Sequence, residues 1–327
     1  MARVKKSESA ALSAEGKAAR PLVLAERLDP MLDVVFRRLF DEEQGLRLLC
    51  SFVNAVLGWT GERALVKLSA LPTKAKGDNA KDKEAEFDVY AVDGLGRRYE
   101  VEIQLREQGF YANRALYYWA KMYAFQLDKS KDYMDLAPCL GIHLMNWRMW
   151  DGPRRHHRFE LREADTHERL TDHLGLHMLE VPKYTESLEG LGSDEERWLY
   201  FLRHGRDMPT EQAQDLGEVF MEAHQRLTHV SQEEALRLRA LSREKEILDR
   251  RTERRWEREH GRAEGLLEGE RLFLTRLLTR RFGASHRWED RLAKLTTSAQ
   301  VEQALDLAEQ HASDLTAFLA ALDALGA

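Results

Sequence analysis

Two β-rich runs on either side of a short turn constrain the fold of this chain more than any other feature. Residues 86–92 form the first run, residues 98–105 form the second, and Asp93-Gly94-Leu95-Gly96 lies between them. Aromatic and β-branched residues around an Asp-Gly turn are typical of an antiparallel hairpin. The pattern therefore predicts a β-hairpin over residues 86–105.

The predicted hairpin carries acidic side chains on one face. Side chains alternate along a strand, so three polar residues share one face of the second run: Glu100, Glu102 and Gln104. The other face carries apolar residues that are expected to face the core: Val101, Ile103 and Leu105. Asp88, on the first run, can project to the same face as Glu102. Two converging carboxylates suit Mg²⁺ or Mn²⁺, although an ordinary polar hairpin face would show the same pattern.

The chain around the hairpin mixes helical and β patterns. Apolar residues recur at three- and four-residue steps near 31–40 and over 41–57, which predicts two helices before the hairpin. A third helix is expected over 111–128, and everything from about 193 onward reads as helical. Short β segments are predicted at 64–68, 139–145, within 157–163 and at 176–181, with a polar loop over 72–85. Together these patterns predict an α/β fold.

Changes in composition divide the chain into four expected parts. Residues 1–25 are small, polar and basic and are expected to form a flexible tail. Residues 26–192 form the α/β core, and residues 193–262 form a charged helical linker or coiled coil, in which acidic and basic side chains nearly balance. Residues 263–327 are expected to form a small helical domain.

Composition excludes several classes of protein. The chain has 327 residues, of which 43% are hydrophobic, too many for a disordered protein. No apolar run approaches the roughly 18 residues of a membrane span, and the N-terminus lacks the apolar core of a secretory signal. Two cysteines, Cys50 and Cys139, are too few for a disulfide framework or a cysteine-based zinc site. The chain is expected to be cytoplasmic. Its net charge of −6 does not indicate nucleic-acid binding, but a bound metal would bring its own positive charge.

Six segments, in chain order, resemble the Rpn-type recombination-promoting nuclease and putative transposase family of the PD-(D/E)XK nuclease superfamily. Residues 33–40 look like its opening Asp-x-x-Phe-Lys-x-x-Phe, and residues 51–57 look like its Phe-Leu-Asn-x-Ile-Leu helix. Residues 87–89 and 101–104 match its Asp-Val and Val-Glu-x-Gln strands. Residues 114–119 match its Arg-x-x-Tyr-Tyr helix, and residues 179–184 resemble its last core strand. The resemblance covers roughly residues 29–190.

The resemblance implies a fold and a set of site residues. The fold is a restriction-endonuclease-like core, with a mixed central sheet flanked by helices, followed by an all-helical C-terminal region. Asp88 and Glu102 would be metal ligands, and the Ile103 carbonyl a third. Gln104 would be the remaining catalytic residue, in the place of the superfamily's lysine. Glutamine can bind water but carries no charge.

Further residues could join this site. Asp33 and Glu100 could belong to the acidic cluster, with Glu100 as a solvated neighbour or as a group behind the ligands, rather than as a ligand itself. Arg114 and Tyr118 share one helix face and would flank the site, where Arg114 could bind a phosphate or orient Glu102. Lys83 could contact the nucleic-acid backbone.

The function implied is hydrolysis of DNA by a metal-dependent endonuclease, with Mg²⁺ or Mn²⁺ as cofactor. The family label also implies a link to transposition or recombination of mobile DNA. DNA is the expected partner, and no membrane association is expected. The alternative is a nuclease-fold scaffold or binding protein with weak or no activity that acts through its C-terminal helices, which could pair subunits or recruit a partner.

Overall fold

The computed structural model describes residues 27–75, 85–127, 132–283 and 288–325. The expected N-terminal tail and Lys83 lie outside these residues. The chain divides into two compact units, the first ending at Arg243 and the second beginning at Glu244. Each unit is described by itself below.

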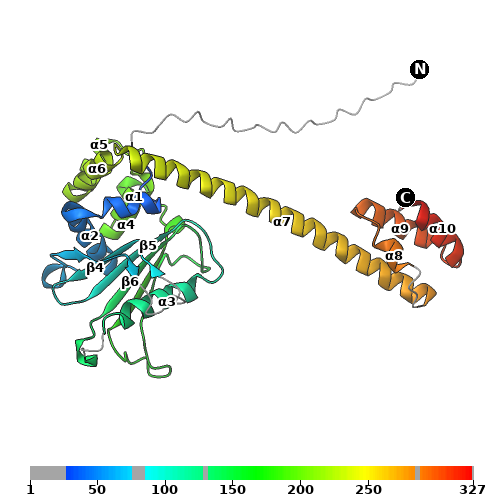
Figure 1. Cartoon of the computed structure of the whole chain (residues 1–327), viewed down its shortest axis with the longest axis horizontal. Helices are drawn as coiled ribbons and strands as arrows, with labels where there is room; N and C mark the ends of the chain where they lie inside the picture. Colours follow the sequence, from blue (N-terminus) through cyan, green and yellow to red (C-terminus); the bar gives the residue numbers. More distant parts are fainter. Residues whose placement is uncertain (1–26, 76–84, 128–131, 284–287, 326–327) are drawn as a thin grey trace, which may run out of the picture. The chain divides into compact units, whose positions relative to one another are not determined.

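A six-stranded mixed sheet forms the centre of the first unit (Figure 1). Its strands lie in the order β1-β4-β5-β6-β8-β7, and their bounds are Leu68–Ala70, Val89–Asp93, Arg98–Gln104, Cys139–Met145, Leu174–Glu180 and His156–Phe159. Strands β5, β6 and β8 run parallel, while the outer pairs are antiparallel. Strands β4 and β5 form the predicted hairpin, with Val89 opposite Val101. Two short strands, β2 (Lys74–Ala75) and β3 (Ala85–Glu86), pair separately.

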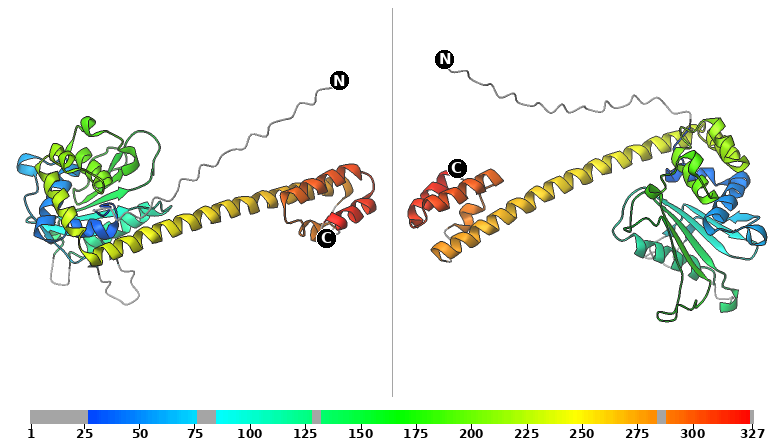
Figure 2. Two further views of the ribbon diagram at one scale, coloured as in Figure 1. Left: turned by 90° about the horizontal axis from the view of Figure 1, so that it is seen from above. Right: turned by 180° about the vertical axis from the view of Figure 1, so that it is seen from behind.

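Helices cover both faces of this sheet (Figure 2). Helix α3 (Tyr111–Ala124) lies over the face that carries Glu102, because its Arg114 contacts that carboxylate. Helices α1 (Asp33–Leu39) and α2 (Glu42–Leu57) pack on the other face. Trp59, directly after α2, meets the ring of Tyr99 edge-on at 6.5 Å on that second face. The result is a sheet between two helical layers, as in restriction-endonuclease-like cores.

The first two helices are joined to later helices by aromatic and buried polar contacts. Phe40 and Phe52 lie 6.0 and 5.8 Å, between ring centroids, from Trp198 of α4 (Asp194–His204). Helices α5 (Thr210–Leu216) and α6 (Glu218–Val230) complete this cluster. From α6, the buried guanidinium of Arg226 donates at 2.7 Å to the Leu39 carbonyl at the end of α1.

Residues 194–230 therefore belong to the first unit, although the sequence predicts a charged linker from 193 onward. Only the charged run that follows lies in the single helix α7 (Glu234–Phe282), which crosses the boundary between the two units. Helices α4 and α6 bury apolar side chains against the first two helices, and these side chains include Trp198, Leu199, Phe201 and Phe220.

The second unit is helical. It contains α7 from Glu244 onward together with α8 (Glu289–Leu292), α9 (Ser298–Gln310) and α10 (Leu315–Leu325). Its core is apolar and includes Leu274, Leu278, Trp288 and Phe318. The Thr297 side chain accepts a hydrogen bond from the Gln300 N–H, which starts α9 with a capping box.

Two local predictions are wrong for identifiable reasons. The strand expected at 64–68 begins only at Leu68, because the backbone of Leu65 bonds instead to the side chain of Asn54, at 2.7 and 3.0 Å. The polar face of β5 is not solvated, because α3 covers it. Glu100 is fully buried rather than a solvated neighbour. In a sheet between two helical layers, polar alternation does not indicate an exposed face.

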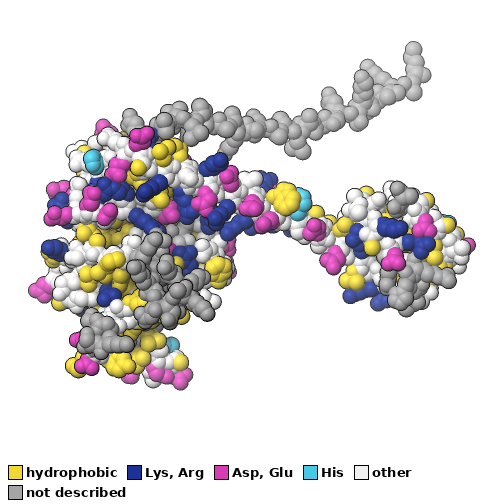
Figure 3. All heavy atoms as spheres, viewed as in Figure 1, with side chains coloured by type: hydrophobic (Ala, Val, Ile, Leu, Met, Phe, Trp, Pro, Cys, Tyr) yellow, Lys and Arg dark blue, Asp and Glu magenta, His cyan; other side chains and the backbone are white. Residues whose placement is uncertain are grey.

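Acidic and basic side chains mix on the surface of the first unit, and no single-sign patch dominates the face in Figure 3. Among the described residues, no helix is both long enough and apolar enough to cross a membrane.

Candidate metal centre

The hairpin holds Asp88 and Glu102 against one another. Asp88 lies directly before β4, and the pairing of Val89 with Val101 places it beside the end of β5. The Ile103 N–H donates to Asp88 Oδ2 at 2.9 Å, and the Asp88 N–H donates to Glu102 Oε2 at 3.3 Å. Each carboxylate is therefore tied to the backbone of the opposite strand. The convergence that side-chain alternation predicts is present.

Glu102 is also held by side chains from two elements. Arg114 Nη2 of α3 donates to Glu102 Oε1 at 2.8 Å, and Gln104 Nε2 donates to the same oxygen at 2.7 Å. The Arg114 guanidinium lies over the Tyr118 ring, 4.9 Å from its centroid. The structure thus brings Gln104, Arg114 and Tyr118 to the carboxylate pair.

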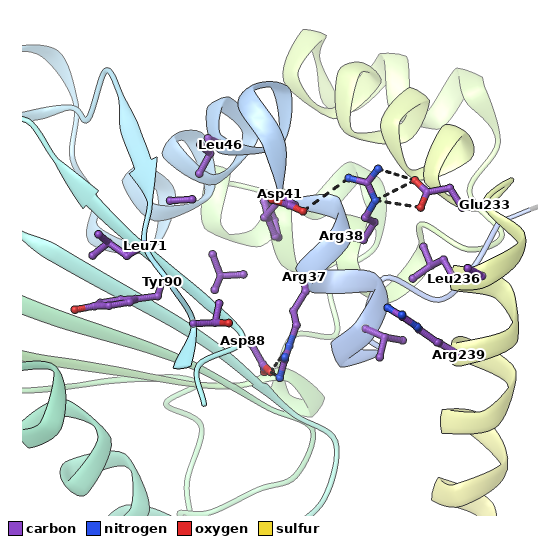
Figure 4. Close-up of a pocket in the computed structure, with 16 residues that line it drawn as sticks. Arg37, Arg38, Asp41, Leu46, Leu71, Asp88, Tyr90, Glu233, Leu236 and Arg239 are labelled. Carbon is purple, nitrogen blue, oxygen red and sulfur yellow. Dashed lines mark hydrogen bonds and ion pairs between the residues drawn. The ribbon is translucent and has the colours of Figure 1, made fainter. Parts of the chain in front are cut away.

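Asp88 has an arginine partner that the sequence did not reveal. Arg37 of α1 donates to Asp88 Oδ1 through Nε at 3.1 Å and through Nη2 at 2.8 Å. Figure 4 shows its side chain extending from α1 to Asp88. Arg37 occupies the lysine position of the family's opening motif. This match was the one sequence signal that could have indicated a role for Arg37 at the site. Asp33, four residues earlier, instead pairs with Arg243 at 3.0 Å, although its charge still acts on Asp88.

Burial sets the protonation of this acidic group. Asp88 is 6% exposed and Glu102 is 2% exposed. Burial raises the pKa of Asp88, and the Ile103 N–H and Arg37 oppose that rise. Burial and the nearby Asp88 charge raise the pKa of Glu102 to about 8, against the effect of Arg114. The two carboxylates therefore repel one another in a region of low solvent access, where added positive charge is favourable.

Two more buried polar groups lie on the same face of the sheet. Burial and the nearby acids raise the pKa of Glu100 well above its ordinary value, and neither of its carboxyl oxygens has a hydrogen-bond partner among the described residues. Tyr111 Oη lies 3.0 Å from His143 Nδ1, on the strand next to Glu102. Burial lowers the pKa of His143 to about 3, so its ring is neutral at physiological pH.

The model of the PD-(D/E)XK nuclease family transposases matches residues 30–255. The chain belongs to this family. No curated protein and no solved structure matches the chain. PD-(D/E)XK nucleases generally use divalent metals, and the nuclease family implies a DNA substrate.

The donor set of this family member fits a hard divalent cation. Both side-chain donors are carboxylates. The N–H and C=O of one residue in an extended strand point the same way, so the Ile103 carbonyl also faces the side of Asp88. Among the described residues, no three His, Cys, Asp or Glu side chains are grouped to hold a metal. Mg²⁺ accepts so small a set because it keeps several waters and takes ligands from substrate phosphates.

A cavity of about 490 Å³ adjoins Asp88 (Figure 4). Its walls come from α1, the β1 and β4 strands and the start of α7. Three arginines line it: Arg37, Arg38 and Arg239. Arg38 is held in ion pairs with Glu42 and Glu233, both at 2.8 Å. The cavity places guanidinium groups next to Asp88.

Proposed function

We propose that the chain is an endonuclease that hydrolyses DNA phosphodiester bonds with Mg²⁺ or Mn²⁺ bound by Asp88, Glu102 and the Ile103 carbonyl. The observation that carries this proposal is the convergence of two buried carboxylates, each hydrogen-bonded to the backbone of the other's strand. Burying two acids side by side is costly unless a cation compensates them. Membership of the nuclease family supplies the class of reaction.

The chain's own residues would position the reacting groups. A bound divalent metal supplies an activated water and polarises the phosphate. Arg114 orients Glu102, and the Tyr118 ring fixes the plane of the Arg114 guanidinium. Gln104 donates its amide N–H to Glu102, which leaves its carbonyl oxygen to accept from water or, as here, from Gln108 at 3.4 Å. With no lysine at this position, charge stabilisation falls to the metal and the arginines.

One observation favours a second candidate function. Gln104 brings no positive charge to the place where the superfamily's lysine lies, and both carboxylates already have arginine partners. A nuclease-fold scaffold that acts through its C-terminal helices would show the same arrangement. Such a scaffold would bind no metal at Asp88.

A plasmid-cleavage assay separates these two functions. Purified full-length protein is incubated with supercoiled plasmid and Mg²⁺ or Mn²⁺, beside the variants Asp88→Ala and Glu102→Ala. We expect nicking or linearisation by wild type and a loss of about 10³-fold in each variant, equivalent to about 4 kcal/mol of transition-state stabilisation. Single-stranded DNA and RNA are tested in parallel, because the geometry does not select among them.

The matched control is Glu211→Ala, which removes an exposed carboxylate from α5 in the same unit. Its cleavage rate should equal that of wild type. Equal rates in wild type, Asp88→Ala and Glu102→Ala on every substrate would reject the nuclease proposal for this site and favour the scaffold.

A further inference from the structure

We infer that Arg37 takes the place of the metal's charge at Asp88 in the metal-free protein, and that metal binding releases Arg37 to hold a backbone phosphate of DNA in the adjoining cavity. The inference rests on the proposed metal site. It adds that metal binding and DNA binding are coupled through one side chain of α1.

The competition follows from which oxygen each donor uses. Asp88 Oδ2 accepts from the Ile103 N–H, so the hairpin backbone already engages it. Both donors of Arg37 reach the other oxygen, Oδ1, at 2.8 and 3.1 Å. Mg²⁺ or Mn²⁺ binds a carboxylate oxygen at roughly 2.0–2.2 Å. Two cations on one small oxygen repel strongly where water is scarce, so a metal on Oδ1 displaces the guanidinium.

Burial explains why an arginine is needed before the metal arrives. Asp88 is 6% exposed, and a buried charge without a partner is strongly destabilising. The Arg37 side chain is 35% exposed, so it reaches Asp88 from the solvent side and can leave without opening the core. Exchange of one cation for another keeps the carboxylate compensated throughout.

The cavity beside Asp88 offers the released side chain a new partner. Arg37 lines this space together with the exposed Arg239, which extends from α7 toward α1 (Figure 4). Arg239 forms no ion pair with any of the described residues. Two guanidinium groups on facing helices suit a phosphate, which they can bind bidentately. A backbone phosphate next to the cleaved bond is therefore the ligand that this wall fits.

Arg114, the second arginine of the centre, is expected to keep its contacts when metal binds. Arg114 is fixed by Glu102, by Gln108 and by the face of the Tyr118 ring. Its side chain extends from α3 to Glu102 on β5 and does not line the cavity. Arg114 is a positioning residue, whereas Arg37 is the exchangeable one.

Coupling through Arg37 makes a quantitative prediction. If the metal frees Arg37 for DNA, then metal tightens DNA binding and DNA tightens metal binding by the same factor. A tenfold factor corresponds to about 1.4 kcal/mol. Without Arg37 the metal should bind more tightly to the DNA-free protein, because its competitor is gone. The coupling factor should fall below that of wild type, to the part that direct contact between metal and phosphate supplies.

The test measures binding rather than cleavage, on the full-length protein. Mn²⁺ affinity is measured by titration calorimetry with and without an oligonucleotide whose phosphorothioate linkages resist hydrolysis. DNA affinity is measured by fluorescence anisotropy with Mn²⁺ or with EDTA. The variants are Arg37→Gln, Arg37→Lys and the control Arg197→Gln, which breaks an exposed ion pair with Asp194 on α4.

We expect Arg37→Gln to bind Mn²⁺ about tenfold more tightly without DNA and to couple Mn²⁺ and DNA binding more weakly than wild type. Arg37→Lys should keep the competition and recover part of the coupling, which also shows that the position tolerates substitution. Arg197→Gln should match wild type. Unchanged or weaker Mn²⁺ binding by Arg37→Gln, or coupling as strong as in wild type, overturns the inference.

Asp88→Asn separates failure of this inference from failure of the proposed function. If Asp88→Asn no longer binds Mn²⁺ while Arg37→Gln behaves as wild type, the metal centre stands and the exchange does not occur. If Asp88→Asn binds Mn²⁺ as wild type does, the metal site itself is elsewhere and both proposals fail.

Discussion

The two units of the chain differ in what they bury. In the first unit, ionisable groups such as Asp88, Glu100, Glu102 and His143 lie almost without solvent. In the second, the described core residues are all apolar, and the ion pair between Arg291 and Asp323 lies at the surface. Buried charge opposes folding, whereas buried apolar surface favours it. Burial of ionisable groups therefore costs the first unit stability, whereas the apolar core of the second unit adds to its stability.

The largest effect on stability is expected in the second unit, whose described core residues are apolar. Trp288→Ala removes a side chain with no exposed surface and should destabilise the second unit by about 3–5 kcal/mol. Trp256→Ala, at a 59% exposed position, is the control and should cost less than about 0.5 kcal/mol. Calorimetry of the full chain measures both. Loss of metal binding in Trp288→Ala would show that the second unit also supports the centre.

Metal should stabilise only the first unit, which holds Asp88 and Glu102. Mn²⁺ at 100 times its dissociation constant should raise the free energy of unfolding of the first unit by about 2.7 kcal/mol. Asp88→Ala should abolish this increase, and the transition of the second unit should not move. Differential scanning calorimetry with Mn²⁺ and with EDTA measures the effect. A shift of both transitions, or one that survives Asp88→Ala, would contradict the assignment.

Acid should destabilise the first unit through His143. Its pKa of about 3 lies below the ordinary 6.5, so between these values the unfolded chain binds a proton that the folded unit does not. Stability from this group is full above about pH 6.5 and is lost as pH falls. Between about pH 8 and pH 5 the loss is about 2 kcal/mol.

The variant His143→Gln isolates this contribution from the carboxylates, whose raised pKa values act in the opposite direction. Relative to wild type, its free energy of unfolding should increase by about 2 kcal/mol between about pH 8 and pH 5. Urea denaturation at each pH gives the comparison. A pH-independent difference would show that the pKa of His143 is the same in the folded and the unfolded chain.

The smallest effect is expected at Glu100. Its raised pKa keeps the buried side chain protonated, so Glu100→Gln replaces one neutral group by another of the same shape. The free energy of unfolding should change by less than about 1 kcal/mol. Glu180→Gln is the control, because Glu180, like Glu100, has no exposed surface. Lys183 and two backbone N–H groups lower the pKa of Glu180, so this side chain is ionised. Its replacement should lower the free energy of unfolding by about 3 kcal/mol or more. Equal losses would show that Glu100 is ionised.

The local elements of the core could be predicted from the sequence. Strand β6 begins and ends at the predicted residues, Cys139 and Met145, and the hairpin forms where the Asp-Gly turn places it. Helix α3 begins at the predicted Tyr111 but ends at Ala124, four residues early, just before the Gln126 side chain that hydrogen-bonds the backbone of Ala137. Patterns with a period of two or about four residues depend on neighbours in the chain, so they can be recognised without the fold.

The sequence by itself determined the hairpin, the alternation of its side chains and the pairing of Asp88 with Glu102, because all three depend on residues fewer than twenty positions apart. Only the tertiary structure decided that Arg37 reaches Asp88, that Glu100 is buried, and that α4 to α6 pack against the first two helices. Those features join residues far apart in the chain. Their outcome depends on how whole layers pack, which no local pattern encodes.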